Sequence, residues 1–318
     1  MRTVQITKND AEQRVDKFLQ KYFKNMPLSL IYKYIRKKRV KLNGKRSFNN
    51  TLLKEGDILT LYIEDKFFDN CTASTINGAK QPFKAITPCL DIVYEDDNIL
   101  IVDKKPGMLS HADKKVQTDT LIMHIQSYLY HKKSFIPQNE NTFKPAICNR
   151  LDRNTGGLVI AAKTAEALRI MNEKIKLRQV HKFYLCHLQG ILADKQGTLE
   201  GYLTKDNTTN KAYITKESTK DSKGIETKYH VLQEKNDMSL VEVQLITGRS
   251  HQIRAHFAAI GHPLIGDIKY GGKKVQNLTH QALYAYKLVF DFPNEESSLR
   301  YLHKKTVKVP TPYSLTCS

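Results

Sequence analysis

Cysteine pairs, long apolar runs and glycine-rich loops are all missing from this sequence. The five cysteines are scattered and form no Cys-x-x-Cys pair, so nothing suggests a zinc site or a disulfide framework. No apolar run approaches the ~20 residues that span a bilayer, and the N-terminus lacks the apolar segment of a signal peptide. No phosphate-binding loop of the P-loop or dinucleotide type occurs. We therefore expect a cytoplasmic protein.

Acidic side chains are also scarce. The chain holds 51 Lys and Arg against 32 Asp and Glu, a formal net charge of +19. This excess favours a polyanionic partner, through counter-ion release and long-range attraction. RNA, DNA and an acidic membrane surface all fit that balance. Hydrophobic residues make up 40%, as in an ordinary globular protein, and 318 residues are enough for two domains.

The first 65 residues hold the densest positive charge, with fifteen Lys and Arg against seven Asp and Glu. Apolar residues at helical spacing predict a helix over 13–23 and a second one after Pro27. A strand over 40–42 then enters an Asn-Gly turn. The basic residues around this junction are either a solvated helix face or a surface that binds phosphates. We expect RNA contacts from Lys33, Arg36, Lys37, Lys38, Arg39 and Lys41.

Residues 66–88 lack periodicity and carry Asn, Thr, Ser, Gly and Pro, which predicts a linker. Beyond it, a hairpin is predicted over 92–102, a helix from Thr164 to about residue 179, and a strand over 180–190. This order of elements indicates a second, larger domain over 89–318.

The stretch 149–162 places a single carboxylate, Asp152, between Arg150 and Arg153. A polar, glycine-bearing loop follows, and then an apolar run that predicts a buried strand. Opposite charge nearby favours the ionised form of a carboxylate. Two interpretations are possible. In the first, Asp152 forms a structural ion pair at a turn. In the second, it is a nucleophile or base beside a polyanion, and the two arginines contact phosphates.

Two later tracts carry further candidates. Tyr184 lies on a predicted strand, where an aromatic side chain is ordinarily part of the core. Arg249 stands directly before a helix predicted over 251–260, at a place favourable for anions. His251 and His256 are five residues apart, the wrong offset for two metal ligands on one helix face, so we expect no metal site.

Several tracts together resemble the RluA-type pseudouridine synthases. They lie at 104–108, 149–162, 180–190 and 245–270, in the order and at the spacing of that family. Asn149 stands where the family usually has His, Gly156 where it usually has Ser, and Ser250 where it usually has Thr. Residues 1–65 resemble the S4 RNA-binding module that precedes the catalytic domain in many members.

This resemblance implies an α+β fold whose mixed, mostly antiparallel sheet carries the active-site cleft. The implied reaction converts uridine in an RNA chain to pseudouridine, without a metal or an organic cofactor. Asp152 would act at the sugar carbon, and Tyr184 would stack on the target base. Arg249 would pair with Asp152, while Arg150 would fill the gap that the base leaves in the RNA.

The branch with an N-terminal S4 module implies large-subunit ribosomal RNA as the substrate, and we expect a monomer. Two alternatives stay open. One is a tRNA substrate for the same chemistry. The other is a non-catalytic factor that binds ribosomal RNA during assembly.

Overall fold

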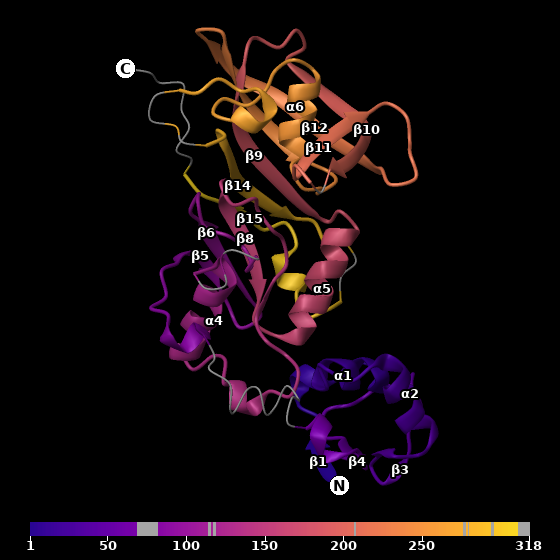
Figure 1. The fold of residues 1–318 in the computed structure, drawn as a ribbon. Coiled ribbons are helices and arrows are strands. Elements are labelled where there is room, and N and C mark those ends of the chain that lie inside the picture. Colours follow the sequence, from indigo (N-terminus) through magenta and orange to yellow (C-terminus); the bar gives the residue numbers. More distant parts are fainter. Residues whose placement is uncertain are drawn as a thin grey trace. The chain divides into compact units, whose positions relative to one another are not determined.

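The computed structural model describes residues 1–68, 82–113, 116, 119–206, 208–275, 278, 280–293 and 296–310 (Figure 1). The chain forms two compact units. The first takes Met1–Cys89, Ile122–Ala146 and Ala162–Arg169, and the second takes Leu90–Leu121, Ile147–Ala161 and Ile170–Ser318. The division of the sequence into 1–65, 66–88 and 89–318 does not coincide with these units and stays a prediction.

Residues 1–68 of the first unit build a small antiparallel sheet with two helices packed on it. The strands follow the order β1-β4-β2-β3. The two predicted helices are α1 and α2, whose apolar faces share one core with the inner face of the sheet. Asn43 and Gly44 both have positive φ, as a two-residue hairpin turn requires. The elements are β1 Arg2–Gln5, α1 Val15–Tyr22, α2 Leu28–Arg36, β2 Val40–Leu42, β3 Lys45–Arg46 and β4 Ile58–Leu61.

The predicted linker 66–88 is described at its two ends. Single 3₁₀ turns span Asp65–Phe67 (η2) and Pro82–Ala85 (η3). Phe68 is buried against Phe23, with ring centroids 5.1 Å apart. Residues 69–81 lie outside the described part of the chain, so the linker stays a prediction.

Two acidic side chains lie close together inside the first unit. Asp10 is fully buried and accepts hydrogen bonds from the hydroxyls of Thr7 and Thr142. Glu140 accepts one from Asn9 Nδ2 at 2.7 Å, while its Oε2 is buried without a partner among the described residues. Burial raises the pKa of Glu140 to about 7; the hydrogen bond from Asn9 opposes this rise, and the charge of Asp10 adds to it.

We expect Glu140→Gln to stabilise the protein above pH 7. Between pH 4.5 and about 7 the folded wild type holds a proton that the unfolded chain releases, so its stability falls as pH rises through that window. The variant has no such titration. Its advantage therefore grows across the window and levels off above it. Because solvent screens this partly exposed group, the plateau is on the order of 1–3 kcal/mol. Urea unfolding at pH 5 and pH 8 measures the difference in stability between the variant and the wild type. Glu55→Gln, in an exposed turn, is the control. A difference for Glu140→Gln that is equal at both pH values would contradict the prediction.

One eleven-stranded sheet organises the second unit. Nine strands follow the order β11-β10-β12-β13-β9-β14-β8-β6-β5, with β15 beside β14 and β7 beside β8. The registered pairings are antiparallel apart from β14–β8, which is parallel, and this confirms the predicted mixed, mostly antiparallel sheet. The strands are β5 Asp91–Glu95, β6 Ile99–Lys104, β7 Ala146–Ile147, β8 Gly156–Ala162, β9 Val180–Gln189, β10 Gln196–Asp206, β11 Lys211–Thr215, β12 Lys223–Lys235, β13 Met238–Leu245, β14 Leu283–Phe290 and β15 Thr306–Lys308.

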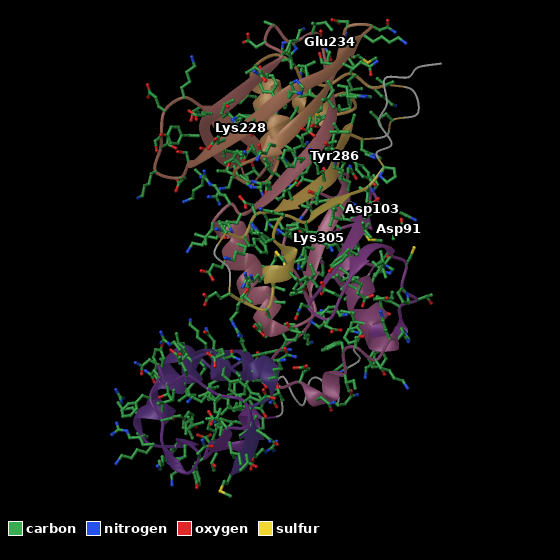
Figure 2. All side chains as sticks on the ribbon, turned by 180° about the vertical axis from the view of Figure 1, so that it is seen from behind. Asp91, Asp103, Lys228, Glu234, Tyr286 and Lys305 are labelled. Atoms are coloured by element: carbon green, nitrogen blue, oxygen red, sulfur yellow. The ribbon has the colours of Figure 1, made fainter. Side chains whose placement is uncertain are left out.

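Helix α6 lies over β11 and β12 (Figure 1). Strand β12 alternates, and its buried Tyr229 packs against Phe257 of α6 with ring centroids 5.8 Å apart. Seen from behind, Figure 2 shows Lys228 and Tyr286 on the opposite face, where Tyr286 donates a hydrogen bond to Glu242. The remaining helical elements are η1 Lys8–Asp10, α4 Leu121–His131, η4 Pro137–Asn139, α5 Ala165–Lys176, α6 Gln252–Ala259, η5 Ile268–Tyr270 and η6 Arg300–Leu302.

Candidate active site

A cleft of about 1220 Å³ opens in the second unit, on the side of the sheet that carries α6. The loop between β7 and β8, strand β9 and the start of α6 contribute to its walls. Every candidate residue predicted in this part of the chain lines it. These residues are Arg150, Asp152, Arg153, Tyr184 and Arg249.

The loop that carries Asp152 is tied down through its backbone. Gly107 N donates to Arg153 O at 2.9 Å, and Ser110 Oγ donates to Leu151 O at 3.0 Å. The carbonyls on both sides of Asp152 are therefore held by the segment 107–110. This anchoring fixes the backbone from which the carboxylate projects into the cleft.

A buried lysine adds to this anchoring. Lys104 is 1% exposed, and its ammonium donates to the carbonyls of Lys105, Met108 and Arg153 at 2.9–3.0 Å. Burial lowers the pKa of Lys104 to about 8, and the charges of Asp152 and Asp103 oppose this. Lys104 thus joins the tract 104–108 to the loop that carries Asp152.

One oxygen of the Asp152 carboxylate faces two side-chain nitrogens. Arg254 Nη1 lies 3.4 Å from Asp152 Oδ2, and His251 Nε2 lies 3.7 Å from the same atom. Both nitrogens come from the start of α6. Asp152 retains 29% exposure of its side chain, so it faces the cleft as well as these partners.

The predicted pairing of Arg249 with Asp152 is wrong: Arg254 takes that place. His251 adopts a left-handed backbone conformation, φ 61°, between Arg249 and the first turn of α6. The chain therefore turns before the helix, and Arg249 stays exposed at the rim of the cleft. Arg254 lies on the buried side of the first turn, with 9% of its side chain exposed.

The flanking arginines also do not pair with Asp152 in the described part of the chain. Arg153 Nε instead donates to Gly107 O at 3.1 Å. Arg150 lines the cleft beside His111, whose pKa is lowered by burial and by the charge of Arg150. Both guanidinium groups thus remain available to the cleft rather than to the carboxylate.

Arg254 is itself fixed by a second acid. Its Nε and Nη2 donate to the two oxygens of Asp267 at 2.6 and 2.7 Å, and Asp267 is buried. The ring of Tyr270 lies 4.9 Å from the guanidinium carbon. This bidentate pair leaves only Nη1 for Asp152, which sets the direction of that contact. The sequence did hold a signal for Arg254, since it is a charged residue inside the buried stripe of a helix. Such a residue is almost always paired with an opposite charge.

Tyr184 lies on β9 between Val243 of β13 and Ala285 of β14. The residue is 5% exposed but lines the same cleft as Asp152. Burial raises the pKa of its hydroxyl well above the usual value, and the charge of Asp152 adds to the rise. The phenol is therefore neutral, and its ring belongs to the cleft wall near the carboxylate.

Two of the three departures from the family's motifs, Asn149 and Gly156, have local explanations. Asn149 Oδ1 accepts from Ile160 N at 2.8 Å, and its amide donates to Leu158 O at 3.3 Å, so it closes the base of the loop onto β8. A Cβ on Gly156 would overlap the ring of Tyr284 and crowd Pro106. Both departures thus lie in the support of the loop rather than at the carboxylate.

The candidate RNA-binding residues of the first unit lie on α2, on the turn after it and on β2. Five of them are exposed and Lys41 is half-buried, with its ammonium 5.4 Å from the ring centroid of Tyr62. None forms an ion pair with an acidic residue of the described ranges. Their role in RNA binding stays a prediction.

Further cations surround the carboxylate in the second unit. The cleft is also lined by Lys176, Arg178, Lys182, Lys205 and Lys269. Burial lowers the pKa of Lys182, which stands two residues before Tyr184 on β9. A guanidinium-held carboxylate in a cation-lined cleft is the arrangement expected of an enzyme that acts on a polyanion.

Comparisons with known proteins agree with this class. Residues 98–259 match the family model described as RNA pseudouridylate synthase. An uncharacterized RNA pseudouridine synthase of Mycoplasma capricolum is 33% identical over 310 residues, 95% of each chain. Ribosomal large subunit pseudouridine synthase C of Vibrio parahaemolyticus is 28% identical over 302 residues, 92% of this chain and 89% of that protein. The structure of human RNA pseudouridylate synthase domain containing 1 has a TM-score of 0.53 and 24% identity, over 72% of this chain and 88% of that one, and shares the fold.

The chain therefore belongs to the RNA pseudouridylate synthase family. It is an isomerase that converts uridine in RNA to pseudouridine, and the predicted RluA-type family is confirmed. In the described ranges, no group of three metal-binding side chains lies where it could hold an ion. None of the helices described is long and apolar enough to cross a membrane.

Proposed function

We propose that this protein modifies uridines in large-subunit ribosomal RNA, as a monomer in the cytoplasm. The observation that carries the proposal is the position of Asp152, which faces a cation-lined cleft while Arg254 contacts one of its oxygens. The relative from Vibrio parahaemolyticus is named for a large-subunit substrate, which supports the choice of RNA.

The chemistry begins with cleavage of the bond between C1′ and N1 of the target uridine. The uracil turns, and its C5 is joined to C1′ in place of N1. Positive character develops at the sugar carbon as the bond breaks, and an ionised carboxylate can stabilise it, attack it or take a neighbouring proton. Asp152 supplies this carboxylate. C5 loses its proton to the solvent and the released N1 takes up a proton, so the net change is an isomerisation.

The target base must first leave its stack, which costs a few kcal/mol. Tyr184 offsets part of that cost, because stacking on an aromatic ring is worth about 1–3 kcal/mol per base. Arg150 fills the space that the base leaves. Arg153 and Arg249, both exposed at the cleft, bind phosphates on either side of the flipped nucleotide.

The first 65 residues act as an S4-like module that holds the surrounding RNA. Their basic residues neutralise phosphates, so they contribute affinity without choosing the uridine. This assignment depends on the exposed cations of α2 and of the turn that follows it.

We expect charge removal in this module to weaken RNA binding and to flatten its salt dependence. Each lost phosphate contact lowers the slope of log K against log salt by about one. A variant with glutamine at Arg36, Lys37, Lys38 and Arg39 tests this in filter binding between 50 and 200 mM salt. The matched control places glutamine at four exposed lysines of the second unit, Lys216, Lys220, Lys223 and Lys228. A slope that changes equally in both variants would locate the contact elsewhere.

Chemical derivatisation of pseudouridine tests the proposed substrate. Total RNA from a strain lacking the protein is compared with RNA from its parent, because product and substrate have equal mass. Sites lost from large-subunit ribosomal RNA support the proposal. Sites lost only from tRNA favour the same chemistry on tRNA, and no lost site favours a non-catalytic role in ribosome assembly.

A further inference from the structure

The two oxygens of Asp152 have different surroundings. Oδ2 faces both Arg254 Nη1 and His251 Nε2, at 3.4 and 3.7 Å. Oδ1 accepts no hydrogen bond from the described residues. The reaction needs one carboxylate oxygen that is oriented but unoccupied, and Oδ1 meets that requirement.

The hydrogen bonds of Tyr270 determine which nitrogen of His251 carries the proton. The Tyr270 hydroxyl oxygen accepts from Ala212 N at 2.8 Å and lies 2.9 Å from His251 Nδ1. The hydroxyl has one proton, and the described residues offer it no acceptor other than Nδ1. It therefore donates to Nδ1, which leaves the hydrogen of the neutral ring on Nε2, facing Asp152.

The ring is held neutral and in place by its surroundings. His251 has 12% of its side chain exposed, and the charged groups facing it are Asp152, Arg254, Asp267 and Lys269. Burial lowers the pKa of His251 more than the charge of Asp152 raises it. Its backbone is in the left-handed region, φ 61°, which turns the chain just before α6 and directs the ring toward Asp152.

We propose that Tyr270 fixes His251 as the tautomer with hydrogen on Nε2, so that His251 positions Asp152 through Oδ2 and leaves Oδ1 to act on the sugar. The 3.7 Å separation shortens to a hydrogen bond when RNA closes the cleft. Arg254 places a positive charge beside this oxygen, and His251 adds a second, neutral hydrogen-bond donor. This assignment rests on the proposed function of Asp152, and it adds two positioning residues to the site.

Nuclear magnetic resonance of protein labelled with ¹⁵N-histidine tests the tautomer directly, without any RNA. His251→Gln identifies the signals of His251 by their loss. The wild type should show the hydrogen on Nε2, and Tyr270→Phe should give a mixture, because Phe cannot donate to Nδ1. Hydrogen on Nδ1 in the wild type overturns the proposal.

Two substitutions at His251 separate positioning from folding. His251→Gln carries its amide near the place of Nε2 and can still donate to Asp152, whereas His251→Asn carries its amide near Nδ1 and tolerates the left-handed backbone. With an unmodified ribosomal RNA transcript containing 5-tritiated uridine, we expect release of tritium to slow ~100-fold in His251→Asn and ~10-fold in His251→Gln. RNA affinity should stay unchanged in both.

Equal rates in the two variants overturn the positioning role. Equal midpoints of thermal unfolding exclude loss of folding as the cause of a slow rate. Failure of the proposed function is a different result, because the wild type would then release no tritium from this transcript while the tautomer could still be measured.

Discussion

Asp152→Asn is expected to lower the single-turnover rate of pseudouridine formation by at least ~10⁴-fold and to leave RNA affinity within about threefold. The amide keeps the shape of the side chain but carries no charge, so it neither stabilises nor attacks the sugar carbon. The fold is retained because Arg254 keeps its bidentate pair with Asp267. Tritium release from 5-tritiated uridine in RNA measures the rate, and fluorescence anisotropy of labelled RNA measures the affinity.

Asp113 offers a matched control for this experiment. It is a second carboxylate that lines the cleft, and Asp113→Asn should keep a rate within about threefold of the wild type. If Asp152→Asn retains activity, or if both variants lose it equally, Asp152 is not the reacting group.

Asp267→Asn is expected to lower the free energy of unfolding by about 3–5 kcal/mol, the largest stability effect we anticipate for one side chain. Asp267 is buried and bonded to Arg254 at 2.6 and 2.7 Å, so its loss leaves a buried guanidinium without its main counter-charge. The freed guanidinium also reorients, and Asp152 loses its partner. Urea unfolding measures the stability, and the surviving folded protein should turn over more slowly than the wild type.

An exposed ion pair gives the comparison for Asp267. Asp91, labelled in Figure 2, lies 3.5 Å from Lys105, and both side chains are more than half exposed. Asp91→Asn should change stability by less than ~1 kcal/mol. A double replacement of Asp267 by Asn and Arg254 by Met should cost less than the two single changes together, because no buried charge is then left unpaired. Strict additivity would contradict the buried-pair account.

Local pattern was enough to predict much of the fold. The amphipathic helices of the first unit and the strand that carries Tyr184 follow from the spacing of their apolar residues. A helix was predicted to begin at Thr164, and Thr164 Oγ1 accepts from Ala167 N at 3.1 Å at the start of α5. These features depend on interactions within a few residues, which is why the sequence reveals them.

The partner of Asp152 depends on contacts across about a hundred residues, and the sequence pointed to the wrong arginine. Arg249 and Arg254 are five residues apart, and both belong to the same tract. Only the left-handed turn at His251 and the buried acid at Asp267 decide which guanidinium points inward. Neither can be recognised from spacing, since both depend on tertiary contacts rather than on the local sequence pattern.

The contact between Gly156 and Tyr284 has a consequence for how the loop can be redesigned. The two residues stand opposite each other in the parallel pair of β8 and β14, and any side chain at 156 would occupy the volume of the tyrosine ring. Introducing serine at 156 therefore requires a smaller residue at 284. That exchange would also remove the hydroxyl that donates to Asp103 at 2.7 Å, so substitutions at the two positions have to be made together.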